Sequence, residues 1–113
     1  MFDLAEPQVP QISAEEVKAA IEHRQKIVLL DVRTEGECAR GVIVGAINLP
    51  VDQVIAKVEG VVPDKEVTVY VYCLSGSRSV YAVAAMIGLG YQHVYSMTSG
   101  LLSWRAKGYS LGV

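Results

Sequence analysis

Cys73 and the six residues after it form the segment of this sequence best suited to chemistry. They read Cys-Leu-Ser-Gly-Ser-Arg-Ser and follow an apolar run, Val67 to Tyr72. A thiol is thus followed closely by an arginine, and the small polar residues between them suit a tight turn and a helix cap. The reactive form of cysteine is the thiolate, and its pKa falls from about 8.5 to about 3.5–7.5 at a helix N-terminus or beside a cation. The segment therefore predicts an activated thiolate.

The flanking elements would position this thiol. Val67 to Tyr72 contains four β-branched residues, which is typical of a central strand covered on both faces. Ser79 to Leu89 has helical length with no proline and no charge, which predicts a buried helix. A loop between such elements directs unpaired backbone N–H groups, and the positive end of the helix dipole, at one point. We expect Cys73 to lie at that point, with Arg78 as the neighbouring cation and Gly76 allowing the backbone to turn.

A cysteine at a strand end is also a common core residue, because cysteine is among the most buried residue types. Here serines, a glycine and an arginine follow Cys73 at once. Such polar and charged residues are poor packing neighbours for an inert core thiol, which favours the functional interpretation.

The segment from Cys73 to Ser79 resembles the active-site loop of the rhodanese-like sulfurtransferases, in the Cys-x-x-Gly-x-Arg-Ser form of single-domain members. Other segments resemble motifs of that family in the same order along the chain. They are Leu30 to Glu37, Gly41 to Pro50, Gly90 to Tyr95 and Ser99 to Trp104. The chain departs from the family pattern outside the loop, where an aromatic residue, histidine, proline and glycine are replaced. The residues at those places are Cys38, Val42, Val44 and Ser99.

This resemblance implies a sulfurtransferase. Cys73 would attack the outer sulfur of a donor such as thiosulfate, carry it as a persulfide, and pass it to cyanide or a thiol. The loop would bind the substrate and stabilise the persulfide through its N–H groups. The expected substrate-binding residues are Leu74, Ser75, Gly76, Ser77, Arg78 and Ser79. We expect no metal and no other cofactor, because both nucleophiles can arrive as anions.

Two alternatives remain open at this stage. The first is a non-catalytic or sulfur-carrier rhodanese-like module that acts with a protein partner. The presence of Cys73, Gly76 and Arg78 argues against a dead site, whereas a carrier that exchanges sulfur with a protein partner would keep the same loop. A cysteine phosphatase or arsenate reductase also needs a thiolate in an anion cradle, but the phosphatase pattern has five residues between cysteine and arginine. This chain has four, Leu74 to Ser77, which favours a ring of N–H donors sized for one added sulfur.

A second buried strand is expected from Ile27 to Val32. Asp31 lies near its end and Arg33 directly after it, at the carboxyl edge where open α/β sheets bind ligands. We expect these two residues to form an ion pair that supports the neighbouring loop, and we assign neither a proton-transfer role. Cys38 is expected to be a packed small side chain. A redox partnership of Cys38 with Cys73 is the alternative, and it would require Cα atoms about 4.4–6.8 Å apart.

Alternating strands and helices predict one rhodanese-like α/β domain over residues 1–113, with a central parallel sheet of about five strands and helices on both faces. The expected strands lie within residues 9–12, 27–32, 45–50, 67–72 and 93–96, and residues 1–12 form a lead-in. The expected helices span residues 13–21, 35–40, 51–59, 79–89 and 101–107.

Composition narrows the functional classes. A hydrophobic share of 51% fits a sheet covered on both faces. The net charge of −2 offers no basic surface for nucleic acid. No apolar run reaches the roughly 20 residues of a membrane span, and the N-terminus lacks the positive region of a signal peptide. Two cysteines make no disulfide framework. We therefore expect a cytoplasmic protein whose partners are a small sulfur donor and a thiol, cyanide or protein acceptor.

Overall fold

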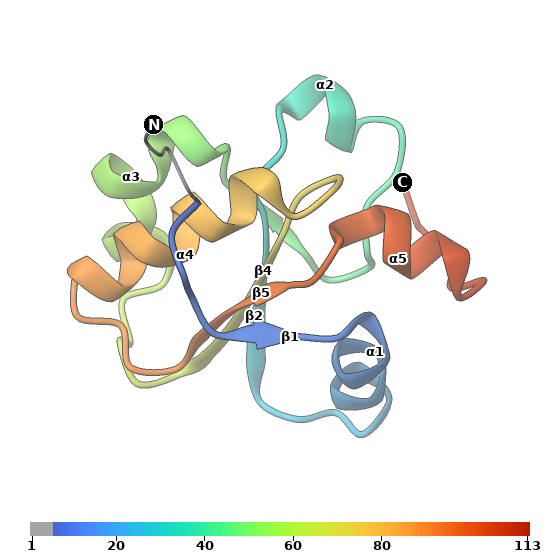
Figure 1. Ribbon diagram of the computed structural model, residues 1–113, viewed down its shortest axis with the longest axis horizontal. Coiled ribbons are helices and arrows are strands. Elements are labelled where there is room, and N and C mark those ends of the chain that lie inside the picture. The colour runs from blue at the N-terminus through green and yellow to red at the C-terminus, as the bar shows by residue number, and fades with distance from the viewer. Residues whose placement is uncertain (1–5) are drawn as a thin grey trace.

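The computed structural model describes residues 6–113, which form a five-stranded sheet between two layers of helices (Figure 1). The sheet order is β1-β5-β4-β2-β3, and the strands pair in parallel throughout. The strands are β1 (Gln11–Ile12), β2 (Ile27–Asp31), β3 (Ile47–Asn48), β4 (Thr68–Tyr72) and β5 (Val94–Met97). The predicted α/β architecture is confirmed.

The centre of the sheet is β4, which lies between β5 and β2. Its register places Tyr72 beside Asp31, the last residue of β2. The pairing continues one step further, because the Val32 N–H donates to the Tyr72 carbonyl over 3.0 Å. The chain after β4 therefore leaves the sheet beside the chain after β2, at the shared carboxyl edge.

Side chains of the central strands alternate between two apolar clusters because successive strand residues point to opposite faces. Val69 and Val71 belong to the cluster beneath α3 (Val54–Val61) and α4 (Ser77–Gly88), whereas Tyr70 and Tyr72 belong to the cluster beneath α1 (Ala14–Glu22) and α5 (Gly100–Ala106). Figure 1 shows these helix pairs on opposite sides of the sheet. Trp104 is 2% exposed and anchors the second cluster.

The element boundaries differ from the predicted ones by a few residues. The helix after Cys73 begins at Ser77 instead of Ser79, because Gly76 takes the left-handed conformation (φ 98°) at the N-cap and the chain turns there. The helix expected over 51–59 divides into a short 3-10 helix, η1 (Val51–Gln53), and α3. The strand expected over 45–50 shortens to β3. The first five residues of the predicted lead-in, and with them most of the N-terminal stretch considered for a signal peptide, lie outside the described residues.

Sequence capping signals specify two helix starts. Ser13 and Glu16 form a reciprocal capping box at α1, in which the Ser13 hydroxyl accepts from the Glu16 N–H over 3.0 Å. Thr34 and Glu37 form a second one at α2 (Glu35–Cys38). Across residues 6–113, no helix has both the length and the apolar character needed to cross a membrane.

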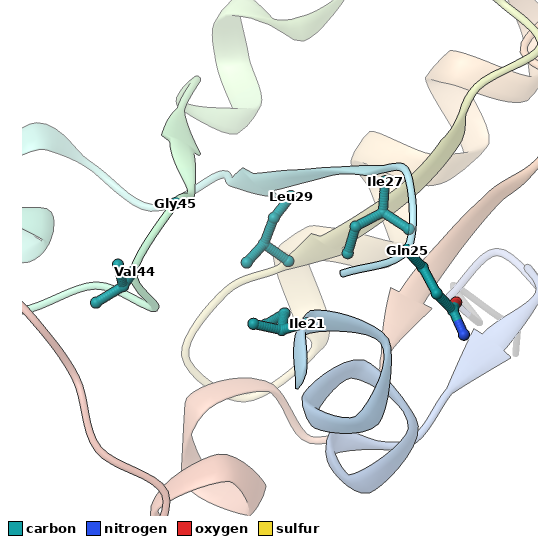
Figure 2. Close-up of a pocket in the computed structure, with 6 residues that line it drawn as sticks. All are labelled: Ile21, Gln25, Ile27, Leu29, Val44 and Gly45. Atoms are coloured by element: carbon teal, nitrogen blue, oxygen red, sulfur yellow. The ribbon is translucent and has the colours of Figure 1, made fainter. Parts of the chain in front are cut away.

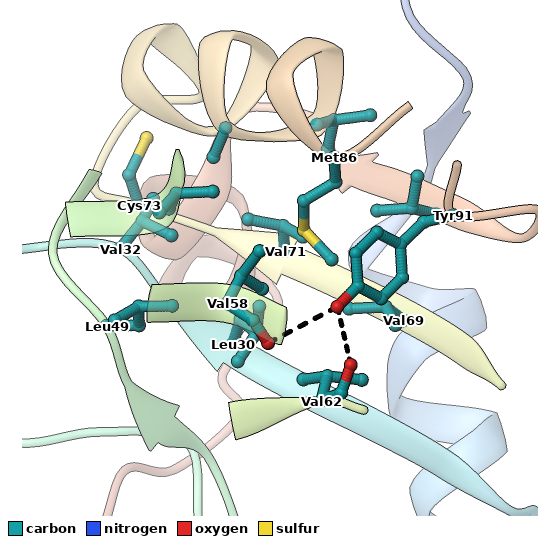
Figure 3. Close-up of a cluster of buried hydrophobic side chains, with 14 residues drawn as sticks. Leu30, Val32, Leu49, Val58, Val62, Val69, Val71, Cys73, Met86 and Tyr91 are labelled. Carbon is teal, nitrogen blue, oxygen red and sulfur yellow. Dashed lines mark hydrogen bonds between the residues drawn. The ribbon is translucent and has the colours of Figure 1, made fainter. Parts of the chain in front are cut away.

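Tyr91 links the end of α3 to the chain after α4. Its side chain is buried, and its hydroxyl donates to the carbonyl oxygens of Val58 and Val62 (Figure 3). Val58 lies in the last turn of α3 and Val62 is the residue that caps its C-terminus, where the helix itself supplies few donors. Tyr91 therefore completes the hydrogen bonding of a helix end as well as filling the core.

We expect Tyr91→Phe to lower the free energy of unfolding by about 1–2 kcal/mol, because it leaves the buried Val62 carbonyl without this donor. Urea denaturation would measure the change. Tyr81→Phe is the matched control, since Tyr81 is 51% exposed on the neighbouring α4 and should be nearly neutral. An equal loss in both variants would show that the Tyr91 hydroxyl has no special role.

Candidate active site

Cys73 is the first residue after β4, and its side chain is held by the loop that leads to α4. The Gly76 N–H donates to the Cys73 sulfur over 3.1 Å. The sulfur lies at the margin of the α3–α4 cluster and points away from the packed valine side chains (Figure 3). Cys73 is fully buried, so the sulfur is enclosed by its own loop in this conformation.

Two opposing effects act on the Cys73 thiol. Burial raises the pKa of the thiol because a low-dielectric environment disfavours the charged form. Hydrogen bonds from Ser79, Gly76 and Arg78 lower it by a larger amount in total, so the pKa of Cys73 lies below its ordinary value. The Ser79 contribution comes from both its backbone and its side chain. The loop thus favours a thiolate even without exposure to water.

The start of α5 binds two carbonyls of the loop that encloses the sulfur. The Leu101 N–H donates to the Cys73 carbonyl and the Leu102 N–H to the Leu74 carbonyl, each over 3.0 Å. Both donors lie in the first turn of α5, whose N–H groups have no partner within the helix. The start of α5 therefore orients the peptide units that follow Cys73.

This contact requires a glycine at position 100. Gly100 has a left-handed backbone (φ 50°), and a Cβ there would overlap the Cys73 carbonyl oxygen and crowd the Leu74 carbonyl. The preceding Ser99 is also left-handed (φ 60°), although the residue is not glycine. Two successive left-handed residues thus bring the α5 backbone against the loop.

A buried pair of hydroxyls supports the same sulfur. The Cys73 sulfur lies 3.7 Å from the Ser79 hydroxyl, which in turn lies 2.7 Å from the Ser96 hydroxyl. Ser79 and Ser96 are both fully buried. Ser96 comes from β5, so the neighbouring strand contributes to the site through Ser79.

The Arg78 guanidinium, expected to be a cation beside the thiol, is paired with a carboxylate. It forms two hydrogen bonds with the Glu37 carboxylate, at 2.7 and 3.0 Å. This bidentate pair joins the first turn of α4 to α2. The Arg78 guanidinium, together with the Thr34 N–H, lowers the pKa of Glu37 to about 2.

Asp31 and Arg33 form the expected buried ion pair. The Arg33 Nη2 lies 2.6 Å from the Asp31 carboxylate, and the Arg33 side chain also donates to the Gly41 carbonyl over 2.8 Å. The Asn48 amide donates to the carbonyls of both residues of the pair. These contacts hold the segment after β2 beside the loop.

Cys38 lies beside that pair and is half-buried, as expected for a packed side chain. Burial, with the negative charge of Asp31 as the next cause, raises the pKa of Cys38 to about 11. Cys38 and Cys73 are both free thiols. The two cysteines therefore have opposite tendencies to ionise.

The remaining predicted residues lie on the outer side of the loop. Leu74 is 38% exposed, and Ser75 and Ser77 are exposed with their hydroxyls 3.4 Å apart. None of these three side chains forms a hydrogen bond with the Cys73 sulfur. A separate hollow of about 200 Å³ lies between the end of α1, β2 and the turn at Val44 and Gly45 (Figure 2). No loop residue lines that hollow.

Sequence reasoning missed Glu37 and Ser96 as members of this site. The capping box accounts for Glu37 locally, so nothing in the sequence pointed to a distant arginine. Ser96 did carry a signal, because it is a polar residue within an otherwise apolar strand and a buried hydroxyl requires a partner.

We expect Gly100→Ala to lower the free energy of unfolding by about 2–4 kcal/mol, from a left-handed alanine and a backbone overlap together. The new methyl group would also move α5 from the loop and raise the pKa of Cys73. Urea denaturation and titration of the thiol would measure both effects. Gly88→Ala is the control, because no atom lies within 4 Å of a Cβ there. Unchanged stability in Gly100→Ala would contradict the close approach.

We expect Glu37→Gln to lower stability at neutral pH by about 1 kcal/mol, a typical value for a partly exposed pair. Glutamine keeps the capping box and removes only the charge. Because the folded-state pKa of Glu37 is depressed from 4.5 to about 2, its stabilisation is present above about pH 4.5 and is lost as the pH falls toward 2. Denaturation from pH 2 to 7 should therefore give a flatter acid limb in the variant than in an exposed control, Glu35→Gln. Parallel acid limbs would exclude the ion pair as the cause.

Comparison with known proteins finds relatives of this chain. The chain is 30% identical over 100 residues to a sulfurtransferase of Allochromatium vinosum, covering 88% of this chain and 92% of that protein. It is 38% identical over 65 residues to the thiosulfate sulfurtransferase PspE of Escherichia coli, covering 58% of this chain and 62% of PspE.

A solved structure shares the fold. The crystal structure of a thiosulfate sulfurtransferase from Pseudomonas aeruginosa superposes with a TM-score of 0.85 at 28% identity, over 92% of this chain and 20% of that one. Residues 13–107 match the Rhodanese-like domain family. The loop, its sheet position and these relatives lead to one assignment, that the chain belongs to the rhodanese-like domain family and is related to sulfurtransferases.

Proposed function

We propose that this protein is a thiosulfate sulfurtransferase that carries the transferred sulfur as a persulfide on Cys73. The observation that carries the proposal is the ring of hydrogen bonds at the Cys73 sulfur, with the Gly76 N–H at 3.1 Å and a lowered thiol pKa. Names of relatives support the choice of donor, since two of those compared are thiosulfate sulfurtransferases.

In the first step, the Cys73 thiolate attacks the outer sulfur of thiosulfate. A new S–S bond forms to Cys73 while the S–S bond of thiosulfate breaks, and the electron pair of the broken bond leaves with sulfite. No proton or external electron is needed, because the outer sulfur keeps its negative charge in the persulfide and the second negative charge of the leaving sulfite balances that of the thiolate. In the second step, cyanide or a thiolate attacks that outer sulfur and regenerates the Cys73 thiolate. Two half-reactions predict ping-pong kinetics.

The loop would stabilise the charge at both stages. Amide donors fixed before the reaction stabilise an anion without reorganisation. When Cys73 ionises, the Ser79 hydroxyl can turn from the Gly76 carbonyl toward the sulfur, while the Ser96 hydroxyl donates to Ser79. This arrangement supplies hydrogen-bond donors. It needs no general base, because the nucleophile of each step is already an anion.

Access to the sulfur requires movement of loop side chains, because Cys73 is fully buried. Leu74 is the adjoining loop residue and is already partly exposed.

We expect incubation with thiosulfate to add the mass of one sulfur atom to the protein, and cyanide to remove it with formation of thiocyanate. Cys73→Ser should abolish both changes, whereas Cys38→Ser should retain most of the activity. Intact-mass spectrometry and a thiocyanate assay would provide the measurements. Equal activity in the parent and both variants would rule out Cys73 as the nucleophile.

A titration of the thiols tests whether the pKa of Cys73 is lowered, independently of whether thiosulfate is the sulfur donor. The ultraviolet absorbance of the thiolate should show one midpoint below the ordinary value of about 8.5, absent in Cys73→Ser, and one near 11 from Cys38. A low midpoint without sulfur loading would reject thiosulfate as donor. Hydrolysis of an aryl phosphate would instead favour the phosphatase alternative.

A further inference from the structure

A pocket with unpaired positive charge lies beside the Cys73 loop. It has a volume of about 240 Å³, well above the roughly 10–15 Å³ that admits one water molecule. We call it the arginine pocket. It is lined by Arg33, Glu37, Arg40, Leu74 and Arg105.

The charges in this pocket do not cancel. Arg33 is neutralised by Asp31, and Glu37 is neutralised by Arg78. Within residues 6–113, the side chains of Arg40 and Arg105 form no ion pair and no hydrogen bond. Two positive charges are therefore available in a protein whose net charge is −2. A concave site lined by one sign of charge raises the local concentration of ligands of the opposite sign.

Both arginines are carried by segments tied to the loop. Arg40 follows α2 and precedes Gly41, whose carbonyl accepts from Arg33 over 2.8 Å. Arg105 belongs to α5, whose first turn binds the carbonyls of Cys73 and Leu74. Figure 1 shows α2 and the start of α5 at the same end of the sheet as the loop between β4 and α4. The pocket is thus held in a defined position relative to the sulfur.

We propose that Arg40 and Arg105 bind the anionic end of the sulfur donor and select donors that carry a sulfonate group. This inference rests on the proposed sulfurtransfer and names the donor class. The sulfonate of thiosulfate occupies the arginine pocket beside Leu74, and its outer sulfur is directed toward Cys73. Guanidinium groups match oxyanions through several N–H donors, so two of them can hold one sulfonate. The same contacts bind the sulfite that leaves after the S–S bond breaks.

Donor selectivity tests this assignment. Arg40→Gln and Arg105→Gln would each lower the rate constant of persulfide formation from dilute thiosulfate roughly threefold to tenfold, and the double variant by more. Loading from the persulfide of 2-mercaptoethanol, which has no sulfonate group and carries its only negative charge on the persulfide sulfur, would change little. Lys26→Gln is the control, because Lys26 carries the same charge at the opposite end of β2. Rapid-quench mass spectrometry would measure the rate of persulfide formation from each donor.

Salt provides a second measure. The parent and Lys26→Gln should lose loading rate with thiosulfate as the ionic strength rises, since exposed charges are screened over about 10 Å at 0.1 M. The double variant should show a weaker dependence. Equal losses on both donors, or no loss on thiosulfate, would overturn the selectivity assignment.

A binding measurement distinguishes failure of this inference from failure of the proposed function. If neither donor adds sulfur to the parent, the proposed function fails. Calorimetry of Cys73→Ser with thiosulfate still decides the pocket, because that variant binds without reacting. A weaker Kd after loss of both arginines supports the anion site, and an unchanged Kd overturns it.

Discussion

The site depends on the hydrogen bonds by which the first turn of α5 holds the carbonyls of Cys73 and Leu74. These bonds fix the peptide units that follow Cys73, and the chain then turns so that the Gly76 N–H donates to the sulfur over 3.1 Å. Neither α4 nor the loop by itself supplies this constraint. It requires two backbones in close contact, and Gly100 makes that contact sterically possible.

Charge is arranged around this constraint in neutral pairs. Arg78 is bound to Glu37, and Arg33 is bound to Asp31, so neither guanidinium acts as an isolated cation beside Cys73. The pKa of the thiol is instead lowered mainly by hydrogen bonds, which act at short range and survive burial. The ion pairs join α2 and the end of β2 to the loop. Their contribution is to position the backbone, while the side chains of Arg40 and Arg105 form no ion pair within residues 6–113.

Burial of Cys73 has two opposite effects on its thiolate. An enclosed sulfur is desolvated, which raises its pKa, yet the same enclosure strengthens each hydrogen bond from the loop. Cys38 shows what burial does without such donors, because its pKa rises to about 11 beside Asp31. Two cysteines in one small protein thus differ in reactivity through their hydrogen bonds and charges.

The sequence by itself determined the architecture and the position of the thiol. Hydrophobic runs of strand length, the helix between Gly76 and Gly90, and the capping box at Ser13 are local signals, and each element they predicted is present within a few residues. The order of strands and the segment from Cys73 to Ser79 then placed the sulfur at the carboxyl edge of β4. The Asp31–Arg33 pair was also foreseeable, because the two residues are close in the chain.

Only the tertiary structure decided what surrounds that sulfur. Glu37 binds Arg78, Ser96 supports Ser79, α5 holds the loop carbonyls, and Arg40 and Arg105 line one pocket. Each of these relations joins segments that are remote in sequence, and no periodicity or local propensity encodes the distance between them. They follow from how the helices pack on the sheet, which depends on the whole core at once.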